Sequence, residues 1–200
     1  ASQTISFPAI TDKTYGDAAF TLNATSNSGL TVTYSVVSGP ATIAGNMVTI
    51  TGAGAVTIAG DQAGDANYLA ATQATQTFNV NKAILTVTAN DKTKAYLQAN
   101  PALDYVITGF VYSENNSVVS GAAAISTTAA VNSIPGTYPI TVAVGSLSAA
   151  NYSFNFVNGT LTVNQATQTI SFPAITDKTY GDAAFALNAS SNSGLAITYS

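Results

Sequence analysis

A near-identical repeat constrains this chain more than any other feature of its sequence. Residues 1–35 return as residues 166–200, at an offset of 165 positions and without a gap, and only five of the 35 pairs differ. The five pairs are similar in size or exchange Thr for Ala, so the alternation of apolar and polar positions is unchanged. They are Ser2/Thr167, Thr21/Ala186, Thr25/Ser190, Thr31/Ala196 and Val32/Ile197. The chain is therefore modular, and Ala166 begins another copy of the first module.

The length of the period predicts where the modules meet. A period of 165 residues is too long for one solenoid repeat and fits two domains of about 80 residues each. Residues 77–87 and 160–170 share one form, in which a closing strand, a joint of two or three residues and an opening strand follow each other. We predict domains at 1–82, at 83–165 and at 166–200. The third is truncated inside a predicted strand, so we expect the natural protein to continue.

The joints between these domains indicate an extended array. Connections of two or three residues leave neighbouring domains little freedom. Strands of about 8 to 10 residues, rising roughly 3.3 Å per residue, would make each module on the order of 30 to 40 Å long. We therefore expect a stiff or semi-stiff rod.

Composition and periodicity predict an all-β fold of tandem Ig-like β-sandwich modules. Thr accounts for 29 of the 200 residues, and β-branched side chains suit half-buried sheet surfaces. Leu30, Val32, Tyr34 and Val36 alternate with polar residues, which is typical of a strand with one face in a core. Similar runs in the first module are 5–7, 20–24, 47–50, 55–58 and 77–80.

The second module shows the same alternation, with one segment that leaves its fold open. Tyr138, Ile140, Val142 and Val144 share one face. Tyr152, Phe154 and Phe156 also share one face. Between them, residues 112–120 are less strand-like, and Ser113 followed by Glu114 can start one short helical turn. The second module is thus either a sandwich or a β-grasp-like domain with that turn.

Charge and missing residue types exclude several function classes. The net charge is −4, and the five Lys are scattered, so no basic patch for nucleic acid is expected. His and Cys are absent, which removes imidazole and thiolate metal sites, cysteine nucleophiles, Ser-His-Asp triads and disulfides. We predict no enzyme activity and no cofactor. No apolar run is long enough for a membrane span, and we expect neither a span nor a signal peptide within these residues.

Motifs in both modules resemble known repeat families. The stretches "DKTYGDAAFTLNATSNSGLTVTY" and "GDQAGDANYLAA" resemble Ig-like repeats found in tandem in very large secreted and surface proteins of the Bacteroidota. The stretches "ANPALDYVITGF" and "GTYPITVAVGSLSAANYSFNFVNGTLTV" resemble the bacterial MBG domain of the YGX type. This resemblance implies that 83–165 is an MBG domain and that the protein is extracellular or on the cell surface. Where the first module has Tyr15-Gly16, the second has Tyr96-Leu97; because Leu disfavours positive φ, we expect a different turn there, or a reversal through 98–100.

The repeated stretch "TDKTYGD" has two interpretations. Asp12, Tyr15 and Asp17 can form a small polar surface contact in which the tyrosine ring stacks on a sugar. Alternatively, the stretch is a turn, in which the Asp side chains accept hydrogen bonds from nearby amides, Gly16 allows positive φ and Tyr15 closes the end of the sandwich. We favour the turn.

Two further groups of residues have candidate roles. Asp61 and Asp65 lie four residues apart in a Gly-rich loop, but two carboxylates are few for Ca²⁺, which takes six to eight oxygen ligands. We therefore predict no metal site and keep this pair as the only candidate. Tyr68 and Tyr152 occur in matching "ANY" contexts and Tyr138 follows "PG"; we expect structural tyrosines whose hydroxyls bond to the backbone.

These observations predict a non-catalytic extracellular repeat array that acts as the stalk and adhesive surface of a large bacterial cell-surface or secreted protein. Its partners would be neighbouring repeats and polysaccharide or other cell-surface ligands, bound by many weak contacts along one rod. The alternative is a passive spacer, or a filament subunit with no ligand of its own.

Overall fold

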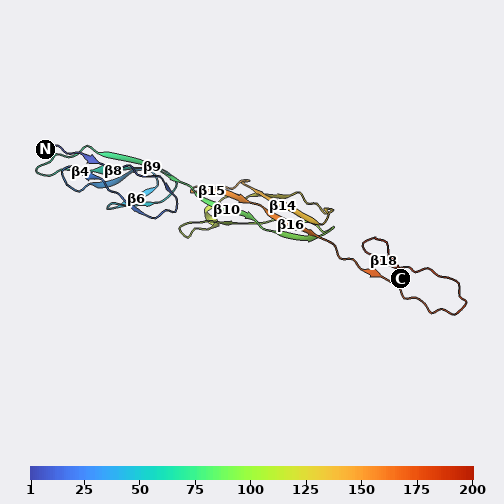
Figure 1. The fold of residues 1–200 in the computed structure, drawn as a ribbon. Helices are drawn as coiled ribbons and strands as arrows, with labels where there is room; N and C mark the ends of the chain where they lie inside the picture. Colours follow the sequence, from blue (N-terminus) through green and yellow to red (C-terminus); the bar gives the residue numbers. More distant parts are fainter.

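The computed structural model describes all 200 residues as modules that follow one another along an extended chain, with the termini at opposite ends (Figure 1). We propose the division into modules that the sequence predicts. Residues 1–82 are called the first module, 83–165 the second module and 166–200 the third segment. No sheet crosses residue 82, because β9 ends at Asn81 and β10 begins at Ala83. No helix is long and apolar enough to cross a membrane.

The first module consists of short strands in two facing sheets and a small additional pair. Its sheets have the orders β2-β9-β8-β5 and β3-β7-β6, and β1 pairs with β4. Only β2 and β9 are parallel neighbours. The strands are β1 (Ile5–Ser6), β2 (Lys13–Thr14), β3 (Phe20–Thr21), β4 (Thr25–Ser26), β5 (Thr33–Ser38), β6 (Ala41–Ala44), β7 (Met47–Ile50), β8 (Gly54–Asp61) and β9 (Ala74–Asn81).

The second module is also built from two sheets, with the orders β12-β10-β15 and β11-β16-β14-β13. The first strand, β10, is parallel to β15, and β11 is parallel to β16. The elements are β10 (Ala83–Ala89), β11 (Lys92–Ala95), β12 (Tyr105–Thr108), η1 (Asn116–Val118), β13 (Ala124–Thr127), β14 (Gly136–Ala143), β15 (Tyr152–Val157) and β16 (Gly159–Asn164).

The all-β prediction is confirmed, and the open alternative for the second module is resolved. Two facing sheets form a sandwich, so the β-grasp-like alternative is not what the chain adopts. The predicted helical turn is present as the 3₁₀ turn η1, which begins after Asn115; the Asn115 side chain accepts a hydrogen bond from the Ser117 N–H. None of its residues is buried, because the apolar face of the module is covered by the second sheet.

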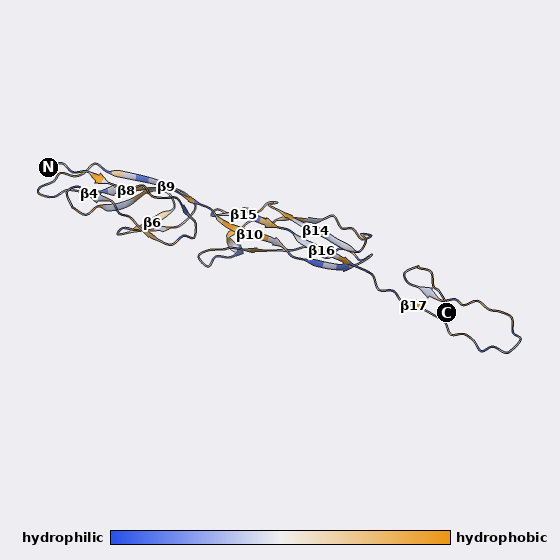
Figure 2. Cartoon of the chain, viewed as in Figure 1, coloured by the Kyte–Doolittle hydropathy of each residue, from blue (hydrophilic) through white to orange (hydrophobic).

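Alternating side chains form the cores. Hydrophobic and hydrophilic positions are interspersed along the strands of both modules (Figure 2), as expected when one face of each sheet is buried. Val87, Ile140 and Leu161 lie in a core within the second module. A second core is continuous across the joint, because Phe78 and Val80 of the first module belong to the same cluster as Leu85 and Tyr152 of the second. Apolar packing thus joins the two modules.

The third segment reproduces the local structure of the first module without its core. It contains β17 (Ile170–Ser171) and β18 (Ser190–Ser191), which pair like β1 and β4. The Thr179 N–H donates to the Asp182 carboxylate, as Thr14 does to Asp17. Short-range hydrogen bonds therefore preserve these turns in a segment whose side chains are mostly exposed.

The turn at Tyr96-Leu97 corrects one expectation. Leu97 adopts a positive φ of 67°, and Gly16 at the equivalent position also has a positive φ, of 105°. The Gln98 side chain accepts a hydrogen bond from the Ala95 N–H, as the Asp17 side chain does from Thr14. The turn is therefore retained rather than replaced, because the surrounding hydrogen bonds impose it on a residue that disfavours it.

Replacing Leu97 with Gly should stabilise the chain. A left-handed conformation costs a non-Gly residue roughly 1–2 kcal/mol, whereas Gly loses roughly 0.5–1 kcal/mol more entropy on folding. Since Leu97 is 59% exposed and loses little burial, we expect a net gain of about 0.5–1 kcal/mol. The midpoint of denaturant unfolding should rise for Leu97→Gly and fall for Val106→Gly, a matched removal of an exposed aliphatic side chain from β12.

Candidate functional site: the joint between the modules

The motif residue Tyr15 lies in the joint between the first and second modules. Its side chain is 5% exposed. The Tyr15 ring packs edge-on against Tyr152, with centroids 5.5 Å apart, and against Tyr112, with centroids 5.2 Å apart. Both partners belong to the second module, so the Tyr15 side chain lies at the end of the first module and packs against the second. Such edge-to-face pairs add about 0.5–1.5 kcal/mol beyond their burial.

Glu114 connects the two buried tyrosines. Its carboxylate accepts a hydrogen bond from the Tyr15 hydroxyl at 3.0 Å and another from the Tyr152 hydroxyl. The Tyr152 hydroxyl also accepts a hydrogen bond from the Val111 N–H at 3.1 Å. Glu114 is the only glutamate in the sequence. Hydrogen bonds to a charged acceptor are worth about 1.5–3 kcal/mol each, so this carboxylate links Tyr15, which is 99 positions away, to Tyr152 across the joint.

The environment of the joint keeps both tyrosines protonated. Burial, followed by the hydrogen bond to Glu114, raises the pKa of Tyr152 to about 12. The same two causes raise the pKa of Tyr15. Both hydroxyls are therefore donors at any physiological pH. The site is suited to holding two modules together.

Backbone contacts surround this aromatic cluster. The Tyr112 hydroxyl donates to the carbonyl of Asp17 at 3.0 Å. Gly16 lies so close to the second module that an added Cβ would stand 2.7 Å from Val111 Cγ1. Gly16 is thus required twice, for its positive φ and for this close approach.

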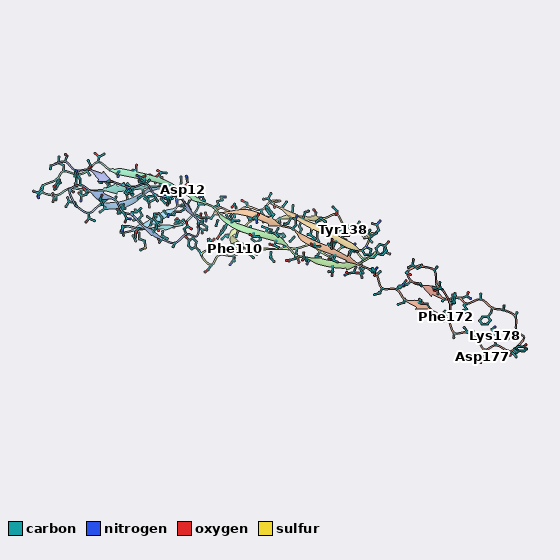
Figure 3. All side chains as sticks on the ribbon, in the orientation of Figure 1. Asp12, Phe110, Tyr138, Phe172, Asp177 and Lys178 are labelled. Atoms are coloured by element: carbon teal, nitrogen blue, oxygen red, sulfur yellow. The ribbon has the colours of Figure 1, made fainter.

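The linker and the neighbouring loops complete the joint. The Asn151 Oδ1 atom accepts a hydrogen bond from the Ala53 N–H at 3.0 Å, and the Asn151 carbonyl accepts one from the Ala83 N–H at 3.0 Å. The Lys82 Nζ atom donates to the Ala149 carbonyl at 3.0 Å. The single linker residue is therefore itself attached to the second module. Figure 3 shows Asp12 and Phe110 near this junction, on either side of it.

The carboxylates of the motif accept backbone hydrogen bonds, one within the turn and one from a strand distant in sequence. Asp12 accepts a hydrogen bond from the Asn79 N–H at 2.8 Å, and Asp17 accepts one from the Thr14 N–H at 2.9 Å. Asp91 of the second module bonds the Thr160 N–H in the same way. The structure thus gathers the motif around the end of the last strand, and Tyr15 faces the neighbouring module. A surface role for Asp12 and Asp17 stays a prediction.

The loop that carries Asp61 and Asp65 uses its carboxylates locally. Asp65 accepts hydrogen bonds from the N–H groups of Asn67 and Tyr68, and Asp61 accepts one from the Gln73 side chain. No group of three or more His, Cys, Asp or Glu side chains occurs in the structure. Calcium binding at this pair is not supported by any further ligand.

The predicted structural tyrosines differ in their contacts. The Tyr138 hydroxyl donates to the Ile134 carbonyl at 2.9 Å, which ties a loop to its own strand. Tyr68 is half-buried, and its N–H bonds to Asp65. Two further tyrosines act in the predicted way although their hydroxyls were not singled out: those of Tyr34 and Tyr105 accept hydrogen bonds from the N–H groups of Ala24 and Ala123.

Several residues of the joint were not identified from the sequence. Sequence reasoning placed Glu114 in a helical turn and noted Asn151 only as part of the "ANY" context of Tyr152. The available signal was that the sole glutamate follows the aromatic stretch "GFVYS". Its partners come from positions 15 and 152, and no spacing rule connects these three residues.

An open groove lies on the first module away from the joint. It has a volume of about 910 Å³ and lies between the two arms of the segment 22–34, which belong to different sheets. Polar and apolar residues both line it, namely Asn23, Ser26, Thr31, Thr33 and Asn46 together with Leu22, Leu30, Val32, Tyr34 and Ile43.

Comparisons with known proteins bear on the second module. Residues 85–162 match the family model of the MBG domain (YGX type). Among solved structures, the chain is similar to one described as the crystal structure of Drosophila N-cadherin EC1-4, with 10% sequence identity and a TM-score of 0.35. That likeness covers 82% of this chain and 50% of the other. No curated protein matches the sequence. The MBG part of the resemblance is thus supported for the second module.

Substituting Gly16 should disturb the joint more than an equivalent change elsewhere. Gly16 and Gly29 both have positive φ, but an added Cβ meets Val111 only at Gly16 and meets nothing within 4 Å at Gly29. We expect Gly16→Ala to destabilise the chain by about 1–3 kcal/mol more than Gly29→Ala, because overpacking adds to the backbone strain. Denaturant unfolding of the two variants measures the difference. Equal losses would show that Gly16 matters only as a turn residue.

The joint should weaken in alkali. Because the pKa of Tyr152 is about 12 in the folded chain and 10.0 otherwise, its contribution to stability is complete below pH 10 and is lost as the pH rises toward 12. Glu114→Gln should lower the pKa of Tyr152 toward its ordinary value, since the charge and the charged acceptor are removed. The ultraviolet absorbance of tyrosinate, followed against pH, measures this; an unchanged titration curve would contradict the proposed contact.

Proposed function

We propose that this chain is part of a non-catalytic extracellular repeat array, which acts as the stalk and adhesive surface of a large bacterial cell-surface or secreted protein. The single observation that carries the proposal is the joint. A linker of one residue, a continuous apolar core and the contact of Tyr15 with Glu114 hold two modules in one orientation. The repeated stretch "TDKTYGD" supplies Tyr15 to this joint. A joint of this kind keeps the array extended.

The joint supports stiffness for an energetic reason. Interfaces between domains in one chain are often polar and permit relative motion. Here the interface includes Tyr15 and Tyr152, with 5% and 2% of their side chains exposed, and burying a large apolar side chain is worth about 1.5–3 kcal/mol. Bending the joint would expose both rings and break the hydrogen bonds to Glu114. The straight arrangement in Figure 1 is therefore the one of low energy.

The adhesive part of the proposal rests on surfaces outside the joint. The groove between the arms of 22–34 offers hydroxyl and amide groups beside the Tyr34 ring, which is a suitable lining for a neutral polysaccharide. The equivalent segment returns in the third segment as 187–199, so successive copies would present the same groove at regular spacing. Weak contacts at each copy would then add through effective concentration.

A passive spacer is the second candidate function. One observation favours it: the repeated stretch "TDKTYGD" serves the turn and the joint, so the chain needs no ligand to account for that repetition. The match of residues 85–162 to the MBG domain is compatible with both candidates and supports an extracellular position for either.

Solution scattering of the whole chain, with a binding screen on the same sample, tests the proposal. We expect an extended particle for the natural sequence and a more flexible one for Glu114→Ala, because two buried hydroxyls lose an acceptor at about 1–3 kcal/mol each. Asp104→Ala is the control: its carboxylate pairs with Lys92 at 2.8 Å on the surface, and such pairs contribute little.

Binding then separates the two candidates. Saturable binding of the chain to an immobilised polysaccharide, lost when the exposed groove residues Asn23 and Thr31 are replaced by Ala, would support adhesion through the groove. Binding to none of a broad panel of cell-surface polysaccharides, by a chain that scatters as a rod, would favour the spacer. A compact or fully flexible natural chain would contradict both.

A further inference from the structure

Exposed apolar side chains gather at the far end of the second module. Leu97, Val131 and Ile134 are 59%, 51% and 70% exposed. They come from the loop that follows β11 and the loop that precedes β14. Both loops lie at the end of the module that faces away from the first module, where Figure 3 also shows Tyr138. We call these three residues the end patch.

The two loops of the end patch are fixed to each other. The Lys94 side chain is 5% exposed, and its Nζ atom donates to the carbonyls of Gln98 and Ala130, one in each loop. The Asn100 side chain donates to the Ala129 carbonyl at 2.6 Å, which forms a second link between them. A buried ammonium group therefore holds an apolar surface in place before anything contacts it, and such preorganisation lowers the entropy lost on docking.

The end patch occupies the position that the joint occupies on the first module. The Tyr15 N–H bonds to the carbonyl of Asn81 at 2.9 Å, and the Tyr96 N–H bonds to the carbonyl of Asn164 at 2.8 Å. Each tyrosine is followed by a residue of positive φ, Gly16 or Leu97. Tyr15 and Gly16 contact the following module, whereas Leu97 is exposed.

The start of each module has a matching arrangement. The Ala83 N–H bonds to the carbonyl of Asn151, which precedes Tyr152. In the first module, the nitrogen of Ala1 bonds to the carbonyl of Asn67, which precedes Tyr68. Since Ala166 repeats Ala1, a complete copy that begins there would hold its own "ANY" loop at the same place. Only Gln165 lies between Ala166, which would hold that loop, and Asn164, whose carbonyl bonds to the Tyr96 N–H. The loop would therefore lie close to Tyr96.

We propose that the end patch docks the amino-terminal end of the next copy of the first module. Tyr96 and Leu97 pack against the tyrosine and leucine of that copy which correspond to Tyr68 and Leu69. Leu69 is 71% exposed on the first module, as expected of a surface that meets a preceding neighbour. This inference rests on the proposed function, because it extends the stiff array through a second kind of joint.

The second joint differs from the first in its chemistry. The first module turns tightly between β4 and β5, where the Gly29 N–H bonds to the carbonyl of Ser26, and it has no counterpart of the segment that carries Glu114. The contact of the end patch is therefore apolar, without a carboxylate between the tyrosines. The array alternates one joint that depends on a charged acceptor with one that depends on burial alone.

The experiment completes the third module and measures both joints in one chain. The sequence of residues 36–82 is added after Ser200, which supplies the strands that the first module has. Pulsed electron spin resonance then measures distances between spin labels at introduced cysteines, which is clean because the chain has none of its own. Thr75→Cys with Ala143→Cys spans the first joint; Ala143→Cys with the copy of Thr75 in the third module spans the second.

We expect equally narrow distance distributions across the two joints. Leu97→Ser with Ile134→Ser should broaden the second distribution at least twofold and leave the first unchanged. Val106→Ser removes an exposed aliphatic side chain from the flank of the second module and should change neither. Leu97→Gly should also broaden the second distribution, because it removes the apolar side chain from the end patch. If Leu97 acted only on its own turn, relief of the backbone strain would leave the second distribution narrow.

The outcomes separate this inference from the proposed function. A narrow first distribution with a broad second one in the natural sequence overturns the docking of the end patch and leaves the first joint intact. A narrow second distribution that survives both serine substitutions overturns it as well. Broad distributions at both joints contradict the stiff array itself.

Discussion

The arrangement of the two modules depends on one carboxylate that receives two tyrosine hydroxyls. Glu114 lies between Tyr15 of the first module and Tyr152 of the second, beside the edge-to-face contact of their two rings. Each ring brings a polar group into an apolar joint, and each hydroxyl needs an acceptor there. A single charged side chain satisfies both, so the joint combines apolar burial with a defined orientation, which burial alone does not provide.

The turn that carries Tyr15 shows how one local device serves several positions. In both modules an Asp side chain accepts a hydrogen bond from an N–H of the last strand, Asp12 from Asn79 and Asp91 from Thr160, and the following turn passes through a residue of positive φ. The first module has Gly16 there and can approach its neighbour closely. The second has Leu97, which costs backbone strain and adds apolar surface at the end of the module. The same turn thus presents a glycine that permits close contact in the first module and an exposed leucine side chain in the second.

Much of the fold could be predicted from local pattern. Period-two alternation identified the strands around 30–36, 137–144 and 151–157, and the repeat identified the modules. The short strands β2, β4, β6 and β11 were missed. For β2 and β11 the reason is that Lys13–Thr14 and Lys92–Ala95 carry polar side chains that resemble a turn. The choice of sandwich over β-grasp was also open, since it depends on which sheet covers an apolar face and not on the helical turn beside it.

The sequence by itself determined the modular period, the all-β fold and the turn at "TDKTYGD", because the repeat is visible in the sequence itself, while strand alternation and the contact of Asp17 with the Thr14 N–H act over a few residues. Only the tertiary structure decided what the motif contacts. Tyr15, Glu114 and Tyr152 are separated by 99 and 38 positions, and they meet because the linker places one module end on another. Burial and shared hydrogen bonds at that contact depend on distances that no local pattern encodes.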